Sequence, residues 1–399
     1  MSETEFELAE HEIKYRLFHE IHVSEIRDYK KCVWAHDWKF KDQLYPLTTA
    51  KPLEFGTAMH LGLEYLMSPQ YVTVPQEQLL TLSKSAFVTE CKKQLASVPV
   101  DPFRSREEIE QDYKERIELG QKMLDYYAKN IRPVIDKDLE PLYTEKNFIV
   151  RLGELKCRCI QCYNRWEKWM IATEDSVEGF GFDGLPVVLE GKIDLILRDK
   201  NTNKVWIRDW KNVRAISDDY EWLENDEQLN LYLLALWMLG LDVAGFQYFE
   251  LKKAVPQPPK VLGRRYQGRL LSTDKNQDTS FELMVEAIRA NNEPIELYID
   301  YLEFLKERGT DHYFKLNKMR RDEAAFKVFY ENLVSVATEM IEHPKEYPTP
   351  TKFGCKFCEF RAPCIERMNG QDPSGLIEVM FEKRPHYYEV KDENSKYSL

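Results

Sequence analysis

The stretch that decides the fold runs from Leu189 to Lys211 and reads LEGKIDLILRDKNTNKVWIRDWK. Two apolar, β-branched runs, Val187–Leu197 and Val205–Lys211, stand on either side of the turn-forming residues 199–203. Runs of this kind around such a turn predict two buried strands joined as a hairpin.

Acidic residues interrupt both predicted strands. Asp194 lies on the first, and Asp209 and Lys211 lie on the second. Residues i and i+2 of a strand face the same side, so Asp209 and Lys211 project together, and Asp194 can face them from the neighbouring strand. One alternative is that these acids merely end strands and that the lysine is solvated, because an Asp-x-Lys sequence is common. An unpaired charge inside an apolar strand is costly, however, which favours a functional site.

Two such carboxylates can bind one or two Mg²⁺ or Mn²⁺ ions, which prefer oxygen ligands. The metal would polarise a phosphate and help to make hydroxide from water, while Lys211 orients or deprotonates that water and offsets charge in the transition state. The main-chain carbonyl of Trp210 is a further candidate ligand. The pattern therefore predicts a metal-dependent phosphodiesterase site.

Two helices are expected to contribute to this site. Gln228 and Tyr232 lie one turn apart on a helix predicted over Glu221–Leu239, facing either bound DNA or the lysine. The alternative is a surface glutamine and a half-buried tyrosine. His60 and Glu64, on a helix that begins near Gly56, offer an imidazole for a mixed N/O metal site and a supporting carboxylate, or purely structural side chains.

Four cysteines form a first thiol constellation. Cys355, Cys358 and Cys364 form a C-x2-C-x5-C loop, and Cys32, more than 300 positions earlier, is the best candidate for a fourth ligand. Four thiolates can hold a tetrahedral zinc or a cubane iron–sulfur cluster. The nearby aromatic residues Phe353, Phe357 and Phe360 favour a solvent-shielded cluster, with zinc as the main alternative and unrelated reduced cysteines as the simplest one.

A second constellation, Cys157, Cys159 and Cys162, lies in segment 153–186, which we expect to be an irregular insertion between strands. Together with Cys91 it could hold a second metal, most naturally zinc, but the spacing indicates no fourth ligand. Free thiols are the favoured alternative.

Basic segments interleaved with aromatic residues point to nucleic acid. Lys260–Arg269 contains Arg264 and Arg265 around Tyr266, and a second basic segment spans residues 315–321. Phosphate contacts combined with aromatic stacking hold single strands. A solvated charged face is the alternative for each segment.

Composition limits the class of protein. The chain has 399 residues and a formal net charge of −12, which argues against a generally DNA-coating surface but not against a local basic groove. No apolar run is long enough to span a bilayer, and the acidic N-terminus lacks a secretory h-region. We therefore expect no membrane association and a cytoplasmic location, where thiols stay reduced.

In this order, the motifs resemble those of the PD-(D/E)XK nucleases of the RecB/AddB type, especially the iron–sulfur branch that includes the CRISPR-associated RecB-like exonucleases. The resemblance covers most of the chain. The matching motifs are the Ser24–Cys32 helix, Gly56–His60, Glu190–Asp194, Asp209–Lys211, Gln228–Tyr232 and Pro348–Cys364. The chain is about twice as long as the small CRISPR-associated members, and it lacks a helicase signature of the G-x4-G-K-[ST] type.

The resemblance implies roles for these residues. His60, Asp194 and Asp209 would be metal ligands, Lys211 would be catalytic, and Gln228 and Tyr232 would support the site and contact DNA. The four residues Cys32, Cys355, Cys358 and Cys364 would carry a [4Fe-4S] cluster. Glu145 resembles a further acidic position of the family.

The resemblance also implies a fold and a function. We expect a restriction-endonuclease-like α/β fold, with a mixed central sheet flanked by helices. The expected parts are an N-terminal helical lobe over 1–135, the nuclease core over 136–255, a helical region ending in the cysteine loop over 256–370 and a polar tail over 371–399.

The implied activity is that of a Mg²⁺- or Mn²⁺-dependent DNA nuclease, an exonuclease on single strands or ends. It would work in recombination, repair or DNA processing, alone or with recombination or replication proteins, and a phage origin would fit. The rival from another class is a non-catalytic DNA-end-binding or assembly subunit with a nuclease-like fold.

Overall fold

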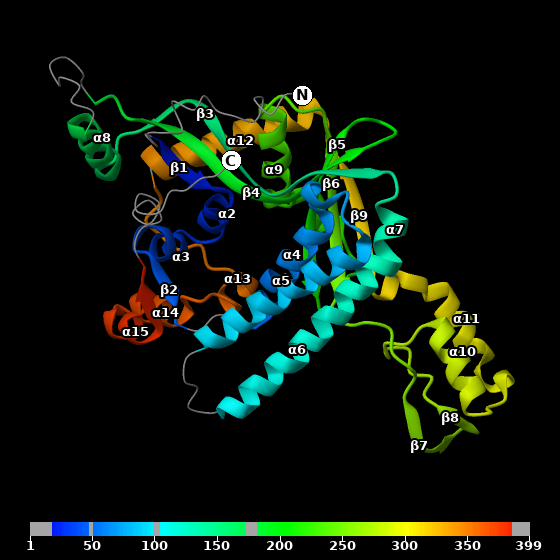
Figure 1. Cartoon of the computed structure of the whole chain (residues 1–399). Coiled ribbons are helices and arrows are strands. Elements are labelled where there is room, and N and C mark those ends of the chain that lie inside the picture. The colour runs from blue at the N-terminus through cyan, green and yellow to red at the C-terminus, as the bar shows by residue number, and fades with distance from the viewer. Residues whose placement is uncertain (1–17, 48–50, 99–103, 173–181, 343, 385–399) are drawn as a thin grey trace.

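The computed structural model describes residues 18–47, 51–98, 104–172, 182–342 and 344–384. Its centre is a mixed six-stranded sheet (Figure 1). The strands are β1 (His19–His22), β3 (Leu139–Cys157), β4 (Leu185–Asp199), β5 (Val205–Val213), β6 (Val243–Lys252) and β9 (Phe314–Arg320). The two strands predicted from the sequence correspond to β4 and β5. β4 extends beyond both predicted ends, and β5 begins as predicted and extends beyond its predicted C-terminal end.

The sheet forks at β4. One edge of β4 pairs with β3 along nearly all of its length. The other edge is shared, because β1 runs parallel to residues 187–190 and β5 runs antiparallel to residues 195–198. Beyond Arg208, β5 leaves β4 and continues beside β6 alone. The residues between these two pairings, 191–194, therefore lie where β4 changes partner.

Helices cover both faces of the sheet. One face packs against α2 (Val23–Lys31), α9 (Glu227–Met238) and α12 (Glu323–Glu342). The other packs against α4 (Lys51–Met67), α5 (Gln76–Ser97), α6 (Arg106–Tyr126) and the short α7 (Arg132–Ile135) that follows α6. Alternation along β5 divides the core, since Ile207 belongs to the first apolar cluster and Trp206 and Trp210 belong to the second. The predicted mixed sheet flanked by helices is confirmed.

Segments near the two ends of the described chain meet (Figure 1). β2 (Leu44–Pro46) pairs antiparallel with β10 (Phe381–Lys383), and Trp38 packs on Phe360 at a ring-centroid distance of 5.5 Å. The helices α3 (Val33–His36), α13 (Lys352–Lys356), α14 (Arg361–Met368) and α15 (Ser374–Met380) complete this region. The expected polar tail thus begins as ordered structure, and residues 385–399 lie outside the described part.

The expectation of an irregular insertion over 153–186 is wrong in its description. β3 continues to Cys157, helix α8 (Ile160–Ala172) follows, and β4 already begins at Leu185. The polar residues of this segment hid the strand, whose backbone groups find partners in the extended start of β4, as the pairing of Cys157 with Leu185 shows.

A small separate unit follows β6. The hairpin of β7 (Val261–Tyr266) and β8 (Arg269–Leu271) packs with α10 (Phe281–Ala290) and α11 (Ile299–Arg308) around its own apolar cluster. The region expected to be helical over 256–370 thus includes this hairpin, and Pro294 stands in the break between α10 and α11. In Figure 1 this unit projects away from the sheet, at the opposite side from α13–α15.

Candidate functional site

Three acidic residues stand at the same level on three neighbouring strands. Leu195 pairs with Arg208, so the next position places Asp194 of β4 against Asp209 of β5, where the two strands separate. On the other edge, the pairs Thr144–Leu195 and Lys146–Ile193 place Glu145 of β3 opposite Asp194. The fork of the sheet therefore gathers carboxylates from three strands.

His60 reaches this fork from α4, which packs on the opposite face of the sheet from α9. Its Nδ1 atom lies 3.4 Å from Asp194 Oδ2, and its Nε2 atom lies 2.8 Å from the main-chain carbonyl oxygen of Trp210. His60, Glu145 and Asp194 each offer one donor atom within 4.8 Å of the others. The main-chain N–H of Trp210 donates to Asp194 Oδ2 at 3.1 Å, which fixes the carboxylate. This is a mixed N/O donor set suited to a hard divalent cation.

Asp209 lies beside this set of three donor residues and not within it. Its Oδ2 atom is 2.7 Å from Lys211 Nζ. Its Oδ1 atom is buried and has no hydrogen-bond partner among the described residues. A buried carboxylate oxygen without a donor is costly unless a cation or ordered water satisfies it. Asp209 therefore extends the donor set toward Lys211.

The charges at the fork perturb one another. Burial and the neighbouring Asp209 carboxylate raise the pKa of Asp194 to about 6, although His60 and Lys211 act in the opposite direction. Burial alone would lower the pKa of Lys211, but Asp209 raises it above its ordinary value. Lys211 is thus held as a cation beside a crowded acidic centre, which a divalent cation would relieve.

The predicted helical pair also lies at the fork. Gln228 Nε2 donates to the Tyr232 hydroxyl at 3.0 Å, and Arg27 of α2 approaches Gln228 Oε1 at 3.4 Å. Tyr232 is buried against Phe148 of β3, with ring centroids 5.8 Å apart. Burial raises its pKa, and the nearby carboxylates of Asp209 and Asp194 add to this shift. Gln228 and Tyr232 therefore line the acidic centre from the α9 side.

Cys32, Cys355, Cys358 and Cys364 come together where the chain ends meet, and we name them the wide thiol group. Burial raises the pKa of Cys358 and of Cys364, and the charges of the other thiols in the group, Cys32 among them, raise both further. Among the described residues, no three of these sulfurs lie within 4.8 Å of one another. Of the three aromatic residues expected to shield them, only Phe360 is buried, while Phe353 and Phe357 are 73% and 76% exposed. The expected aromatic shield is therefore wrong for two of its three members, because both side chains point away from the local core.

Cys157, Cys159, Cys162 and His19 form a second group, which we name the compact thiol group. Their donor atoms all lie within 4.8 Å of one another. Cys91, the expected fourth member, is instead buried in the helical lobe against the core of α4, α5 and α6. Cys91 is therefore excluded from this group, and His19 takes its place. No pattern in the sequence pointed to His19, since β1 brings it in from a distant part of the chain.

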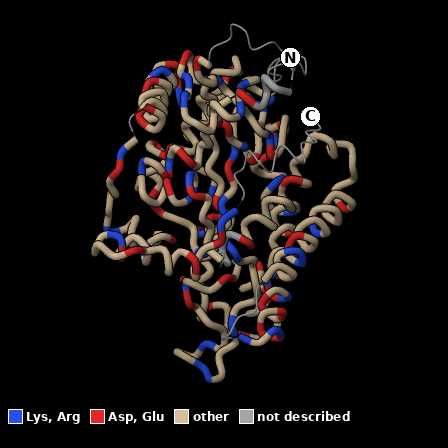
Figure 2. The backbone as a smooth tube through the Cα atoms, turned by 90° about the vertical axis from the view of Figure 1, so that its left-hand side faces the viewer, with Lys and Arg blue, Asp and Glu red and all other residues tan. Residues whose placement is uncertain are grey.

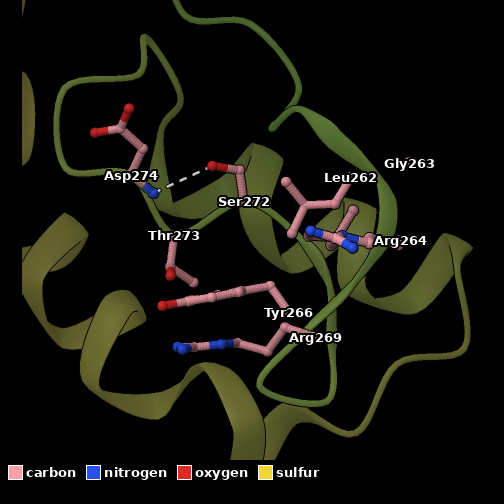
Figure 3. Close-up of a pocket in the computed structure, with 9 residues that line it drawn as sticks. Leu262, Gly263, Arg264, Tyr266, Arg269, Ser272, Thr273 and Asp274 are labelled. Atoms are coloured by element: carbon pink, nitrogen blue, oxygen red, sulfur yellow. Dashed lines mark hydrogen bonds between the residues drawn. The ribbon is translucent and has the colours of Figure 1, made fainter.

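The two arginines predicted to contact DNA differ in their surroundings. Arg265 forms a two-pronged ion pair with the carboxylate of Glu293, at 2.6 and 3.0 Å, so its guanidinium is occupied by a structural partner. Arg264 instead lines an open hollow of about 660 Å³ on the β7–β8 hairpin. Figure 3 shows Tyr266 and Arg269 lying parallel in that hollow. Basic residues gather at the projecting end of this hairpin, whereas acidic and basic residues alternate elsewhere (Figure 2).

A family model of the PD-(D/E)XK nuclease superfamily matches residues 20–365. No curated protein matches the chain. Among the described helices, none combines the length and the apolar character that crossing a membrane requires. The matched region takes in strands β3 to β9, the fork and the wide thiol group. The chain therefore belongs to the PD-(D/E)XK nuclease superfamily.

Proposed function

We propose that this protein is a Mg²⁺- or Mn²⁺-dependent DNA nuclease that hydrolyses phosphodiester bonds at the fork of its sheet. The observation that carries the proposal is the convergence of His60, Glu145 and Asp194 within 4.8 Å, with Asp209 and Lys211 on the adjoining strand. Carboxylates from three strands, an imidazole and a lysine form a donor set and a cation suited to phosphate chemistry.

His60, Glu145, Asp194 and Asp209 would hold the divalent cation, joined by the carbonyl of Trp210. When bound, the cation would polarise the scissile phosphate and favour ionisation of a water molecule. The hydrogen bond from the Trp210 N–H keeps Asp194 in place before the cation arrives, so that the donor set is preorganised.

Lys211 has a separate role in this mechanism. Because its pKa is raised, its ammonium group stays charged and can orient the attacking water and stabilise negative charge on the phosphate. Gln228 and Tyr232 would fix the phosphate strand next to the acids. The Gln228–Tyr232 hydrogen bond holds both side chains in one arrangement.

The wide thiol group holds a [4Fe-4S] cluster in this proposal, which would place the chain in the RecB/AddB-like iron–sulfur branch. A tetrahedral zinc with bonds of about 2.3 Å requires thiolate sulfurs about 3.8 Å apart. The sulfurs of Cys32, Cys355, Cys358 and Cys364 are spread more widely than such a site needs, since no three lie within 4.8 Å of one another. A cubane fits better, because each thiolate binds a different iron atom. A broad absorption band near roughly 400 nm in anaerobically purified protein would support the cluster, whereas a colourless protein with zinc at these residues would contradict it.

The preferred substrate is single-stranded DNA or a DNA end, degraded as an exonuclease would, in recombination, repair or DNA processing. The hollow on the β7–β8 hairpin supports this choice, because Tyr266 offers a stacking surface and Arg264 and Arg269 offer phosphate contacts. Arg265 acts by holding the hairpin through Glu293. Contacts between DNA and this hairpin would lie away from the fork and guide the DNA toward it.

An end-label assay on single- and double-stranded DNA, with and without Mn²⁺, tests the activity. We expect Asp209→Asn and Lys211→Ala to lower cleavage by at least about 10³-fold, because each removes a group that acts on the transition state. Lys200→Ala, on the exposed turn after β4, and Asp242→Asn, at an exposed position directly before β6, are matched controls that should cut normally.

The readout separates the proposal from its rival. A protein that binds DNA ends but cleaves neither substrate with Mg²⁺ or Mn²⁺ would be a non-catalytic end-binding subunit. Normal cleavage by Asp209→Asn would instead show that the chemistry lies elsewhere in the chain.

A further inference from the structure

The compact thiol group draws its members from three elements. His19 opens β1, Cys157 ends β3, Cys162 lies in the first turn of α8, and Cys159 lies on the short connection between β3 and α8. The His19 Nδ1 atom lies 3.4 Å from Cys162 Sγ. Cys157 and Cys162 are each 1% exposed, whereas His19 and Cys159 are half-buried, so that two of the four donors lie below the surface.

The start of β4 brings these elements together. Its Val187 pairs with His19 on one edge, and its Leu185 pairs with Cys157 on the other. Arg165 of α8 donates to the main-chain carbonyl of Phe18 at 2.6 Å, which ties the helix to the residue before His19. On the outside, Asp183 forms ion pairs with Lys156 and Arg158 and closes the loop that carries the thiols. Strand pairing, one hydrogen bond and two ion pairs therefore bring the four donor residues together without a metal ion.

The donor distances select among metals. A zinc with Zn–S bonds of about 2.3 Å and Zn–N bonds of about 2.0–2.1 Å places sulfur and nitrogen about 3.6 Å apart in a tetrahedron. The observed separation of 3.4 Å between Cys162 Sγ and His19 Nδ1 is close to that edge. Three soft thiolates and one imidazole are a Cys3His set, which is common in structural zinc sites with no open position.

We propose that His19, Cys157, Cys159 and Cys162 bind one structural Zn²⁺ ion. This site is separate from the fork and from the wide thiol group, and it does not depend on the proposed nuclease activity. No solvent-facing position is left for a substrate, because all four tetrahedral positions come from the protein.

The zinc would fix the N-terminal strand. β1 pairs with β4 over only four positions and in parallel, which is a weak attachment for an edge strand. β1 leads directly into α2, whose Arg27 reaches Gln228 beside the fork. Holding His19 against Cys157 would therefore anchor α2 at its N-terminal side.

The first test is made on the full-length protein, purified without a histidine tag and free of added metal. Elemental analysis should find one tightly held zinc per chain. X-ray absorption at the zinc edge, which is insensitive to iron, should give a first shell of three sulfur atoms and one nitrogen atom, with Zn–S near about 2.3 Å. Protein without zinc, or zinc with four sulfur ligands, would overturn the assignment.

Variants localise the ion. Cys159→Ala and His19→Ala should lose the zinc, whereas His19→Cys should keep it and change the shell to four sulfur atoms. Cys91→Ala is the matched control, because it removes a buried thiol outside the group and should retain one zinc per chain. Retention of zinc with an unchanged shell in His19→Cys would contradict the proposal. Should an alanine variant fail to fold, the wild-type spectrum and the His19→Cys variant still decide.

Discussion

The two thiol groups are alike in their arrangement along the chain and differ in one donor and in size. Each joins one residue from the N-terminal segment, His19 or Cys32, to three closely spaced cysteines elsewhere in the chain. The donors of the compact group all lie within 4.8 Å of one another, whereas no three of the described sulfurs of the wide group do. Similar spacing in sequence can thus serve different centres, since the separation of the donors decides whether one ion or a cluster of ions fits between them.

The two groups also hold different parts of the chain. The compact group attaches β1 to the end of β3 and the start of α8. The wide group attaches the end of α2 to the C-terminal helices, a junction that also contains the hydrogen bond from Trp34 Nε1 to the carbonyl of Glu346. α2 lies between the two groups in sequence and contacts α9 at the fork through Arg27. Both groups therefore act on the position of α2, one from each end.

The largest expected effect is that of Cys32→Ala. If Cys32 is a cluster ligand as proposed, its loss would open a closure of more than 300 residues and expose the junction where α3 meets the C-terminal helices. We expect the iron to be lost and the free energy of unfolding to fall by about 4 kcal/mol or more, as for other structural metal centres. Chemical denaturation and iron content measure this. If the variant folds normally and loses only cleavage, the wide group takes part in the mechanism and its structural role is wrong.

A smaller loss is expected from Cys159→Ala. It frees only one short strand and one helix, so we expect a destabilisation of about 1–3 kcal/mol. Each variant should lose one metal only. Cys159→Ala should lose zinc and keep iron, and Cys358→Ala should lose iron and keep zinc. Elemental analysis of both variants is the measurement. Loss of both metals in either variant would mean that the groups are one folding unit, and the comparison would fail.

The sequence predicted some of these features and not others, for physical reasons. The hairpin of β4 and β5, with its acids and Lys211, could be predicted. Apolar runs reveal buried strands, and a charged residue within such a strand stands out. The place of His19 in the compact group could not be predicted, since it depends on the pairing of β1 with β4, a long-range contact that no local pattern encodes. The extension of β3 to Cys157 was hidden for a related reason, as its polar residues suggested a loop.

One expectation about side-chain surroundings is wrong, and another stays a prediction although its residue has a partner in the fold. Phe353 and Phe357 have the composition of a shield, yet exposure depends on the direction of each side chain in the folded loop. Arg265 has the charge of a DNA contact, yet Glu293, on a distant part of the same small unit, pairs with it. Residue type at a position predicts chemistry well, whereas the partner it finds is decided by the tertiary structure.

Oxidation by air should affect the wide group before the compact group, and we expect a moderate effect. Each cysteine of the wide group is partly exposed, and two neighbouring phenylalanines leave it open. In the compact group Cys159 is partly exposed, but Cys157 and Cys162 are only 1% exposed. Exposed thiolates react first. On exposure to air we expect the band near roughly 400 nm to bleach with loss of iron while zinc stays bound. Absorbance and zinc content are followed in one sample, and simultaneous loss of zinc would contradict the closed geometry of the compact group.

The smallest expected effect is a pH dependence next to the wide group. His36 is 3% exposed, with Nε2 at 3.1 Å from Glu25 Oε1 and Nδ1 at 2.9 Å from Asp37 Oδ1. Burial alone would lower the pKa of His36, but hydrogen bonds to Asp37 and Glu25 raise it above its ordinary value of 6.5. The folded state therefore binds the proton more tightly than the unfolded state. This stabilisation is fully present below 6.5 and is lost as the pH rises through the raised pKa.

The His36→Gln variant measures that contribution. The difference in melting temperature between wild type and variant should be largest near about pH 6, where a histidine with an ordinary pKa is already substantially protonated, and should shrink at alkaline pH. Lys41→Ala, which removes an exposed partner of the same Asp37, is the matched control and should show little change with pH over this range. A difference that grows with pH would mean that His36 is neutral in the folded protein. If iron content also falls as the stabilisation is lost, the ionic contacts of α3 help to hold Cys32 in the wide group.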